Sequence, residues 1–182
     1  YHYITAGTGV PVDYWHMGFH MSGVIILIFI GFPARRTPDV WSMHANSWWR
    51  YGNVPMWDWL FILAGVSAAL YIGVTWYETK FQFLGFEFFL PEQVLRQGNP
   101  APIDVVFGTV LIIVLLEAVR RVLGIIVPII ILLFTCYAVF GQYIPVQVLK
   151  HPGISWAQYI NNMYFPAEGI YGVTLWIVST VV

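Results

Sequence analysis

Long apolar runs separated by short polar segments dominate this chain. A helix needs about 20 predominantly apolar residues to cross the hydrocarbon core of a bilayer. Four runs have the length and composition to do so, and they lie at about residues 14–33, 56–77, 102–119 and 123–141. The pattern predicts an all-α integral membrane protein with four transmembrane helices.

The charged segment LLEAVRR, residues 115–121, lies at the boundary between the third and fourth runs. One unbroken helix over residues 103–141 would be about 58 Å long, nearly twice the hydrocarbon thickness of about 30 Å. It would also place each arginine at mid-membrane, at a cost of about 2.5–3.5 kcal/mol. We therefore predict that the third helix ends near residue 119 and that the chain reverses at Gly124 in a tight helical hairpin.

The charged residues of this segment form a predicted structural cap. Glu117 lies three and four positions before Arg120 and Arg121, on one helix face and in the favourable order for ion pairs. Such a cluster fits either an ion pair buried on a transport path or an interfacial pair that fixes the depth of the helix. We favour the interfacial interpretation, which places all three side chains at the bilayer boundary.

Three further segments are too short or too polar to form complete transmembrane spans. Residues 79–101 are rich in Phe, but charged residues and Pro91 interrupt them. This pattern predicts a segment that lies in the membrane–water interface on the outer face, either alone or against another protein. Residues 154–165 predict an interfacial amphipathic helix with Ser155 as its N-cap. The apolar run from Gly169 to Val182 would form only about 21 Å of helix, so we expect a truncated fifth span of a longer polypeptide.

Two features refine the four spans. Gly65, Ala69 and Gly73 recur at every fourth position of the second span, where small residues allow another helix to approach closely. We predict that they form a helix-packing face. At the third span, Pro102 and Asp104 suit a helix start, because an acid is favourable near the positive end of the helix dipole.

Composition supports a membrane protein and argues against nucleic-acid binding. The chain is 59% hydrophobic and only 9% charged, whereas soluble domains carry about 25% charged residues. Its net charge of −1 gives no general attraction to nucleic acid. Lys and Arg are more frequent in loops 34–55 and 120–123 than in the other connections, so the positive-inside rule predicts that these two loops are cytoplasmic.

Candidate chemistry is sparse. His16 and His20 are four positions apart on the first span, a spacing that fits a metal or a haem, but the other histidines lie in connecting segments. We favour packing or interfacial histidines and predict no metal or cofactor. The single cysteine, Cys136, excludes a disulfide framework within the chain. The centres of the spans contain no acid of the kind that an ion path usually needs, and no enzyme motif is present. We expect no enzyme activity.

Three segments resemble the fused membrane permeases of the tripartite ATP-independent periplasmic (TRAP) transporters. In that family a LEATRR-like segment joins two helices, an FGPYLP-like turn follows, and an EGIFG-like segment opens a large domain. The matching residues are Leu116 to Arg121, Gly141 to Pro145 and Glu168 to Gly172. The chain departs from the family at Val119, where Thr is expected, and at residues 165–167, where Phe-Pro-Ala replaces Leu-Thr-Thr.

The resemblance implies secondary, usually sodium-coupled, uptake of organic acids across a bacterial inner membrane. A periplasmic substrate-binding protein would deliver the substrate, and the substrate and ion sites would lie in the large permease domain of the same chain. It further implies a small four-helix membrane domain over residues 1–150, a connecting interfacial helix over 151–167, and the start of the large domain over 168–182. No transport residue is expected in this stretch, and the small domain would act as a scaffold.

Two alternatives remain open. The chain could be a non-transporting accessory subunit packed against a larger respiratory or photosynthetic membrane complex, with its aromatic outer segments contacting neighbouring subunits. It could also be a haem-binding membrane subunit that uses His16 and His20.

Overall fold

The computed structural model describes residues 14–34, 50–51, 54–83, 86–165 and 169–181. Four of its helical stretches are long and apolar enough to cross a membrane. They are α2 (Tyr14–Gly31), α3 (Met56–Val74), α5 (Pro102–Leu123) and the stretch Ile126–Tyr143, which joins α6 (Ile126–Phe140) to the 3-10 turn η1 (Gly141–Tyr143). The predicted all-α class with four candidate membrane spans is therefore confirmed.

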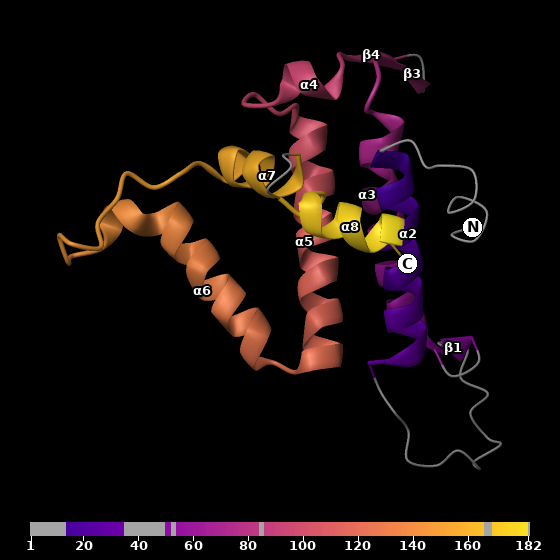
Figure 1. Cartoon of the computed structure of the whole chain (residues 1–182), viewed down its shortest axis with the longest axis horizontal. Helices are drawn as coiled ribbons and strands as arrows, with labels where there is room; N and C mark the ends of the chain where they lie inside the picture. The colour runs from indigo at the N-terminus through magenta and orange to yellow at the C-terminus, as the bar shows by residue number, and fades with distance from the viewer. Residues whose placement is uncertain (1–13, 35–49, 52–53, 84–85, 166–168, 182) are drawn as a thin grey trace.

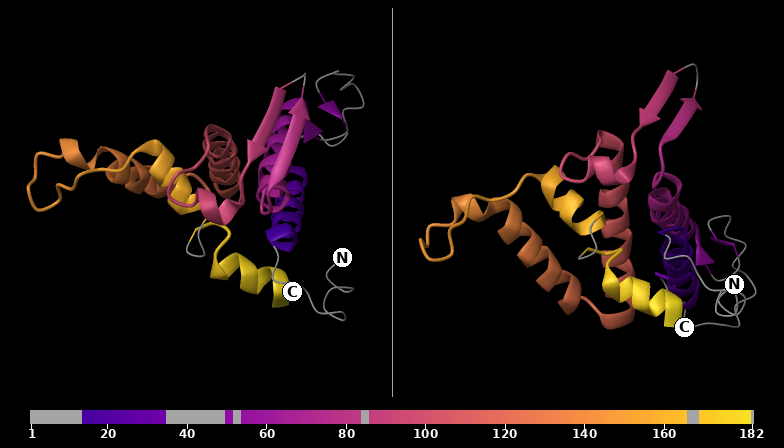
Figure 2. Two further views of the ribbon diagram at one scale, coloured as in Figure 1. Left: turned by 90° about the horizontal axis from the view of Figure 1, so that it is seen from above. Right: turned by 45° about the horizontal axis from the view of Figure 1, so that its top comes forward.

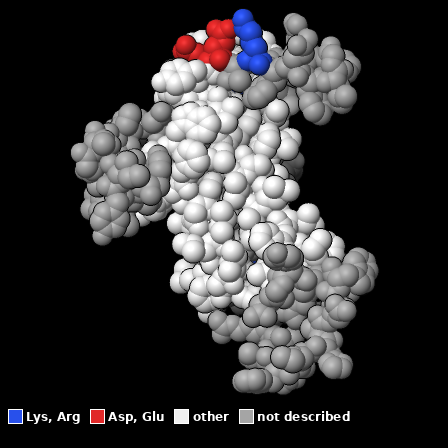
Figure 3. Space-filling model, turned by 90° about the vertical axis from the view of Figure 1, so that its right-hand side faces the viewer, with Lys and Arg blue, Asp and Glu red and all other residues white. Residues whose placement is uncertain are grey.

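The core lies where α2, α3 and α5 run side by side (Figure 1). Fully buried apolar side chains from each helix meet there, including Phe29 of α2, Ile72 of α3 and Leu111 of α5. The face shown in Figure 3 is almost free of charge along its length, and its charged side chains gather at the upper end. A surface of this kind suits hydrocarbon rather than water.

Small elements cover the two ends of this bundle (Figure 1). The short antiparallel strands β1 (Arg50–Tyr51) and β2 (Val54–Pro55) lie at the lower end, together with the turn at Gly124. The hairpin of β3 (Thr79–Phe83) and β4 (Phe86–Leu90) and the short helix α4 (Gln93–Arg96) lie at the upper end. The described part of loop 34–55 thus lies on the same side as the α5–α6 turn, as the charge pattern predicts.

The chain reverses at Gly124, as predicted, but one turn after the predicted helix end. Helix α5 continues to Leu123, and the Gly124 N–H still donates to the carbonyl of Arg120. Gly124 has φ +87° and ψ −176°, a conformation that residues with a β-carbon rarely adopt. The extra turn is consistent with the ion pairs between Glu117 and the two arginines, which need helical geometry to form.

The hairpin is tight at its turn, but α5 and α6 diverge from there (Figures 1 and 2). Helix α7 (Trp156–Tyr164) lies between their upper ends. Ile160 of α7 packs onto Gly108 of α5 so closely that a β-carbon there would clash. On its other side, the Tyr159 hydroxyl lies 2.7 Å from the Thr135 hydroxyl of α6.

The terminal apolar run forms α8 (Val173–Val181), which crosses α2 rather than running beside it (Figures 1 and 2). The sequence predicts here the beginning of a fifth span.

In the Phe-rich segment, the sequence pattern predicts an interfacial stretch, whereas the structure shows paired strands with the register Phe81↔Phe88 and Phe83↔Phe86. The alternation of Phe with other residues was the strand signal that the prediction missed.

Candidate functional site

The predicted cap at the end of α5 is part of a larger cluster that joins three helices, which we name the Arg121 cluster (Phe32, Asp58, Glu117, Arg120 and Arg121). Arg121 Nε donates to Glu117 Oε1 at 2.8 Å, and its Nη2 donates to Asp58 Oδ1 at 2.7 Å. Its Nη1 donates to the carbonyl oxygen of Phe32 at 3.2 Å. One guanidinium therefore ties α3 and α5 to the end of α2.

Burial separates the two arginines of this cluster. The Arg121 and Asp58 side chains are 4% and 0% exposed, whereas Arg120 is 44% exposed and pairs with Glu117 at 2.7 Å. The Arg121 guanidinium also lies 4.3 Å from the centroid of the Phe29 ring. Because a buried charge that loses its partner is costly, the Arg121–Asp58 pair holds the helices together while the Arg120–Glu117 pair faces outward.

The sequence interpretation missed Asp58. Its carboxylate also accepts a hydrogen bond from the Ala34 N–H at 3.0 Å, so it fixes the chain that leaves α2. The available signal was an acid in the first turn of an otherwise apolar helix, flanked by Trp57 and Trp59. An acid at such a position satisfies the helix dipole on its own, so sequence gives no reason to assign it a distant partner.

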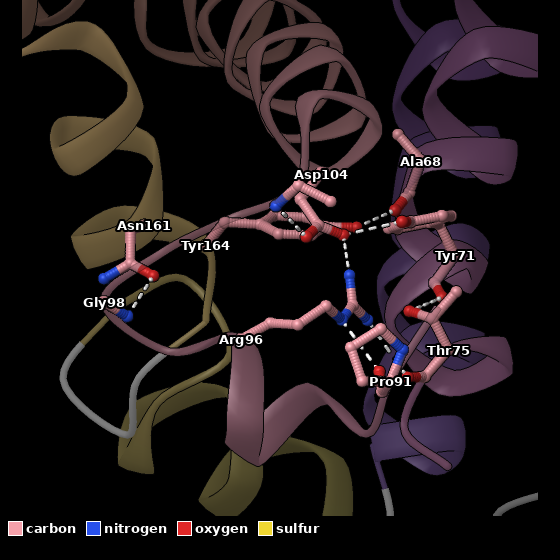
Figure 4. A network of polar contacts seen from close by, with 10 residues as sticks. Ala68, Tyr71, Thr75, Pro91, Arg96, Gly98, Asp104, Asn161 and Tyr164 are labelled. Atoms are coloured by element: carbon pink, nitrogen blue, oxygen red, sulfur yellow. Dashed lines mark hydrogen bonds and ion pairs between the residues drawn. The ribbon is translucent and has the colours of Figure 1, made fainter. Parts of the chain in front are cut away.

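A second buried cluster lies at the opposite end of the bundle (Figure 4), and we name it the Arg96 cluster (Tyr71, Thr75, Arg96 and Asp104). Arg96 Nη1 donates to Asp104 Oδ1, which also accepts from the Tyr71 hydroxyl at 2.6 Å. Arg96 Nη2 donates to the carbonyl oxygen of Thr75 at 3.2 Å. Both charged side chains are almost fully buried, at 3% and 0% exposed.

Asp104 has the helix-start role that the sequence predicts, and a further one. Its Oδ2 accepts from the Ala101 N–H at 2.8 Å, which satisfies a backbone donor at the start of α5. Its Oδ1 receives Arg96 of α4 and Tyr71 of α3. The Arg96 cluster therefore joins α3, α4 and α5 in the way that the Arg121 cluster joins α2, α3 and α5.

The predicted packing face of α3 lies against α2 and α5. A β-carbon at Gly65 would be 2.8 Å from Val114 Cγ1 and 3.1 Å from Ile25 Cγ2, and one at Gly73 would be 2.9 Å from the Trp15 ring. The carbonyl of Ala69 would lie 2.8 Å from a β-carbon at Gly18 of α2. The three small residues therefore permit close helix contact.

Backbone carbonyls in the middle of α3 also anchor the C-terminal elements. The hydroxyl of Tyr164 donates to the Ala68 carbonyl at 2.6 Å, and that of Tyr171 donates to the Ala69 carbonyl at 2.8 Å. Burial raises the pKa of both phenols well above their ordinary value, so both stay protonated and remain donors. These bonds attach α7 and the start of α8 to the bundle.

The two histidines of the first span lie on α2. His16 is buried, and its Nε2 lies at hydrogen-bond distance from the Ser179 carbonyl of α8. His20 is half-buried one turn further along the helix. In the described residues, no three His, Cys, Asp or Glu side chains form a group that could hold a metal ion. His2 and His44 lie outside those residues. The contact of His16 is thus a helix-to-helix bond.

The described spans contain three acids, Asp58, Asp104 and Glu117, and each accepts hydrogen bonds from an arginine. Asp58 and Asp104 lie in the first turns of their helices, and Glu117 lies one turn before the last turn of α5. An acid that carries a proton or cation across the membrane must exchange partners, whereas these are held by buried or bidentate arginines. The arrangement suits a fixed scaffold.

The segments that resemble the permease family lie at helix ends and in the connections between helices. Residues 116–121 form the Arg121 end of α5, and residues 141–145 form the turn after α6. At Gly141 a β-carbon would clash with the His151 ring, so this turn needs glycine. Residues 169–172 carry Tyr171 onto α3, while Glu168 lies outside the described residues. Comparison with known protein families, with curated proteins and with solved structures gives no match to this chain.

Proposed function

We propose that this chain is the scaffold portion of a TRAP-type secondary transporter. The family resemblance implies that the substrates are organic acids carried together with sodium ions. In this proposal it lies in a bacterial inner membrane. The large permease domain of the same polypeptide would carry the substrate and ion sites, and a periplasmic substrate-binding protein would deliver the substrate.

The observation that carries the proposal is that every acid in the described spans is fixed by an arginine. Arg121 ties α2, α3 and α5 together at one end of the bundle, and Arg96 ties α3, α4 and α5 together at the other, with Asp58 and Asp104 fully buried. Buried ion pairs at both ends would keep the helices of this domain in place while a neighbouring transport domain moves. The three segments that resemble the permease family are the second support.

The exposure of α6 supports a role beside another membrane component. Pro128 is its one buried residue, and large apolar side chains such as Leu133 and Phe134 are 62% and 64% exposed. A large permease domain would cover part of this surface. The same observation favours the second candidate function, an accessory subunit packed against a larger membrane complex.

The experiment starts from the complete coding sequence. A sequence that continues past Val182 into a long series of apolar spans supports the permease, and one that stops shortly after it supports the accessory subunit. The encoded protein is then reconstituted in proteoliposomes with its periplasmic binding protein, and organic-acid uptake is measured with and without a sodium gradient.

Scaffold variants give the sharper test. In the reconstituted protein, Arg121→Leu should lower the amount of correctly inserted transporter, and hence the maximal rate, while the KM for substrate and for sodium stays unchanged. Arg120→Leu is the matched control and should have little effect on either. A changed substrate preference or sodium KM in the Arg121 variant would contradict a purely supporting role for this stretch.

A further inference from the structure

His151 lies in the connection between α6 and α7, and its imidazole ring bonds two backbone groups at once. Its Nε2 lies 2.9 Å from the carbonyl oxygen of Tyr137, in the last turn of α6. Its Nδ1 accepts a hydrogen bond of 3.0 Å from the Gly153 N–H. A carbonyl oxygen can only accept, so Nε2 must carry a proton, whereas Nδ1 must carry none in order to accept. The two bonds together therefore require the neutral ring.

These bonds are part of a segment, residues 149–154, that we name the His151 connection. It covers the C-terminal end of α6, where the last carbonyls have no partner within the helix. The Ile154 N–H donates to the Ala138 carbonyl at 3.1 Å, and the His151 N–H donates to the Gly141 carbonyl at 3.4 Å. The His151 side chain thus adds to a set of backbone bonds that attach the connection to α6.

Hydrogen bonds, more than packing, hold the His151 connection in place. Its first residue, Leu149, is 52% exposed, and the preceding Val148 is 92% exposed. An open cavity of about 280 Å³ lies between the end of α6, the turn η1 and residues 152–156. A segment with few buried apolar contacts opens locally at low cost, so the loss of one hydrogen bond matters here.

A proton on Nδ1 would remove such a bond. Nδ1–H would point at the Gly153 N–H, and two donors would then face each other without an acceptor. The C-terminal end of a helix does attract a cation, but this attraction is weak at an exposed site and is screened by salt. We therefore expect the protonated ring to leave its place.

Nothing near the ring would balance its charge. The titratable side chains of the surrounding elements are Cys136 and Tyr137 of α6, Tyr143 of η1, Lys150 of the connection, and Tyr159 and Tyr164 of α7. The Tyr137 ring contacts His151 edge-on, at 4.7 Å between centroids. The chain has no Asp or Glu between Gly124 and Phe165, and no ion pair of the described residues includes His151.

We propose that His151 is an acid-sensitive latch: protonation at Nδ1 releases the His151 connection from the end of α6 and lets α6 move relative to α7. Helix α6 would remain attached through its turn at Gly124 and through the Thr135–Tyr159 hydroxyl contact. The charge pattern predicts that this end of α6 lies on the outer face, where external pH would act on the latch. The inference does not rest on the proposed function.

The size of the effect follows from proton linkage. A solvated imidazole is half protonated near pH 6.5, so opening of the latch takes up one proton below about that pH. Stability of the closed latch is therefore complete at neutral pH and above, and is lost as the pH falls. The open fraction should rise about tenfold between pH 7.5 and pH 5.5.

Hydrogen–deuterium exchange of the full chain in detergent measures this opening. The reporters are the amides of Gly153 and Ile154, and protection factors are compared because they remove the intrinsic pH dependence of exchange. We expect about tenfold lower protection of both amides at pH 5.5 than at pH 7.5. The Gly124 amide, which bonds the Arg120 carbonyl at the other end of α6, should keep its protection.

Variants separate the proton from the other bonds of the connection. His151→Gln keeps a side-chain donor but cannot take up a proton, so protection of Ile154 should no longer depend on pH. His20→Gln, which changes a histidine on α2, is the matched control and should keep the full dependence. Tyr137→Phe removes the hydroxyl bond to the Leu149 carbonyl, 2.9 Å long, and should lower protection by the same factor at both pH values.

A measurement on the unaltered chain covers the case in which His151→Gln does not fold. Nitrogen NMR of histidine-labelled protein at neutral pH should show a His151 ring that is protonated at Nε2 alone. A ring protonated at Nδ1 would overturn the proposal. So would equal or higher protection of Gly153 and Ile154 at pH 5.5, or an acid-dependent loss that persists in a folded His151→Gln variant.

Discussion

Arg121 near the end of α5 donates a 2.7 Å hydrogen bond to Asp58 in the first turn of α3, across 63 positions of sequence. The pair is almost fully shielded from solvent, at 4% and 0% exposed. Arg120, the preceding residue, faces outward instead. Two adjacent arginines of one motif therefore have different physical roles, and substitutions can separate them.

Arg121→Leu should destabilise the protein by about 3–5 kcal/mol, because it leaves the Asp58 carboxylate buried without its partner. Arg120→Leu should cost less than about 1 kcal/mol, as expected for an exposed ion pair. Unfolding in detergent micelles measures both. Equal losses from the two variants would contradict the assignment of Arg121 as the residue that holds the helices together.

The double variant Asp58→Leu/Arg121→Leu should recover much of the stability lost in Arg121→Leu. Replacing both members of a buried ion pair by apolar residues removes the unpaired charge as well as the attraction, and is often neutral. The same unfolding assay gives the coupling between the two sites. A double variant as unstable as the sum of the two single variants would mean that the residues act independently.

At the opposite end, Asp104→Asn should destabilise the protein more than Tyr71→Phe. The first leaves Arg96 buried without a charged partner, whereas the second removes one hydrogen bond, worth about 1 kcal/mol. Limited proteolysis adds a local measurement. If Asp104→Asn loosens α4, the connection between α4 and α5 should be cleaved faster than in the unaltered protein. Equal proteolysis of Asp104→Asn and the unaltered protein would argue against the Arg96 cluster as the anchor of α4.

Gly65→Ala should destabilise the bundle by about 1–3 kcal/mol, because the added β-carbon would lie 2.8 Å from Val114 and force the helices apart. Gly23→Ala on α2 is the matched control, since nothing lies within 4 Å of its β-carbon. It should be neutral or stabilising by up to about 1 kcal/mol, as alanine favours helix. The melting temperatures of the two variants measure these effects. An unchanged melting temperature in Gly65→Ala would contradict the close contact between Gly65 and Val114.

Alkaline pH should weaken the attachment of α7 through Tyr164. Burial raises the pKa of this phenol well above its ordinary value of 10.0. The stabilisation by its protonated form is therefore complete below pH 10 and is lost as the pH rises through the higher folded-state pKa. The Tyr164→Phe variant should lose less stability than the unaltered protein between neutral pH and pH 11. Parallel curves for the two proteins would exclude this contribution.

Features that depend on neighbouring residues can be predicted from the sequence. Apolar run length set the four candidate spans, and Gly124 marked the reversal. The Glu117 pairs with Arg120 and Arg121 follow from helical spacing alone, as does the Ser155 cap, whose hydroxyl accepts from the Gln158 N–H at 3.3 Å. Each involves residues within one helical turn, where backbone geometry brings side chains together whatever the rest of the chain does.

Which helix faces pack against one another depends on the tertiary structure. The pairing of Arg121 with Asp58, the meeting of Arg96, Asp104 and Tyr71, and the insertion of α7 between α5 and α6 all join distant segments. Hydropathy does not encode such meetings, because in lipid every face of an apolar helix is equally compatible with its surroundings. Close packing and the burial of paired charges select the arrangement, and both depend on the three-dimensional fit of whole helices.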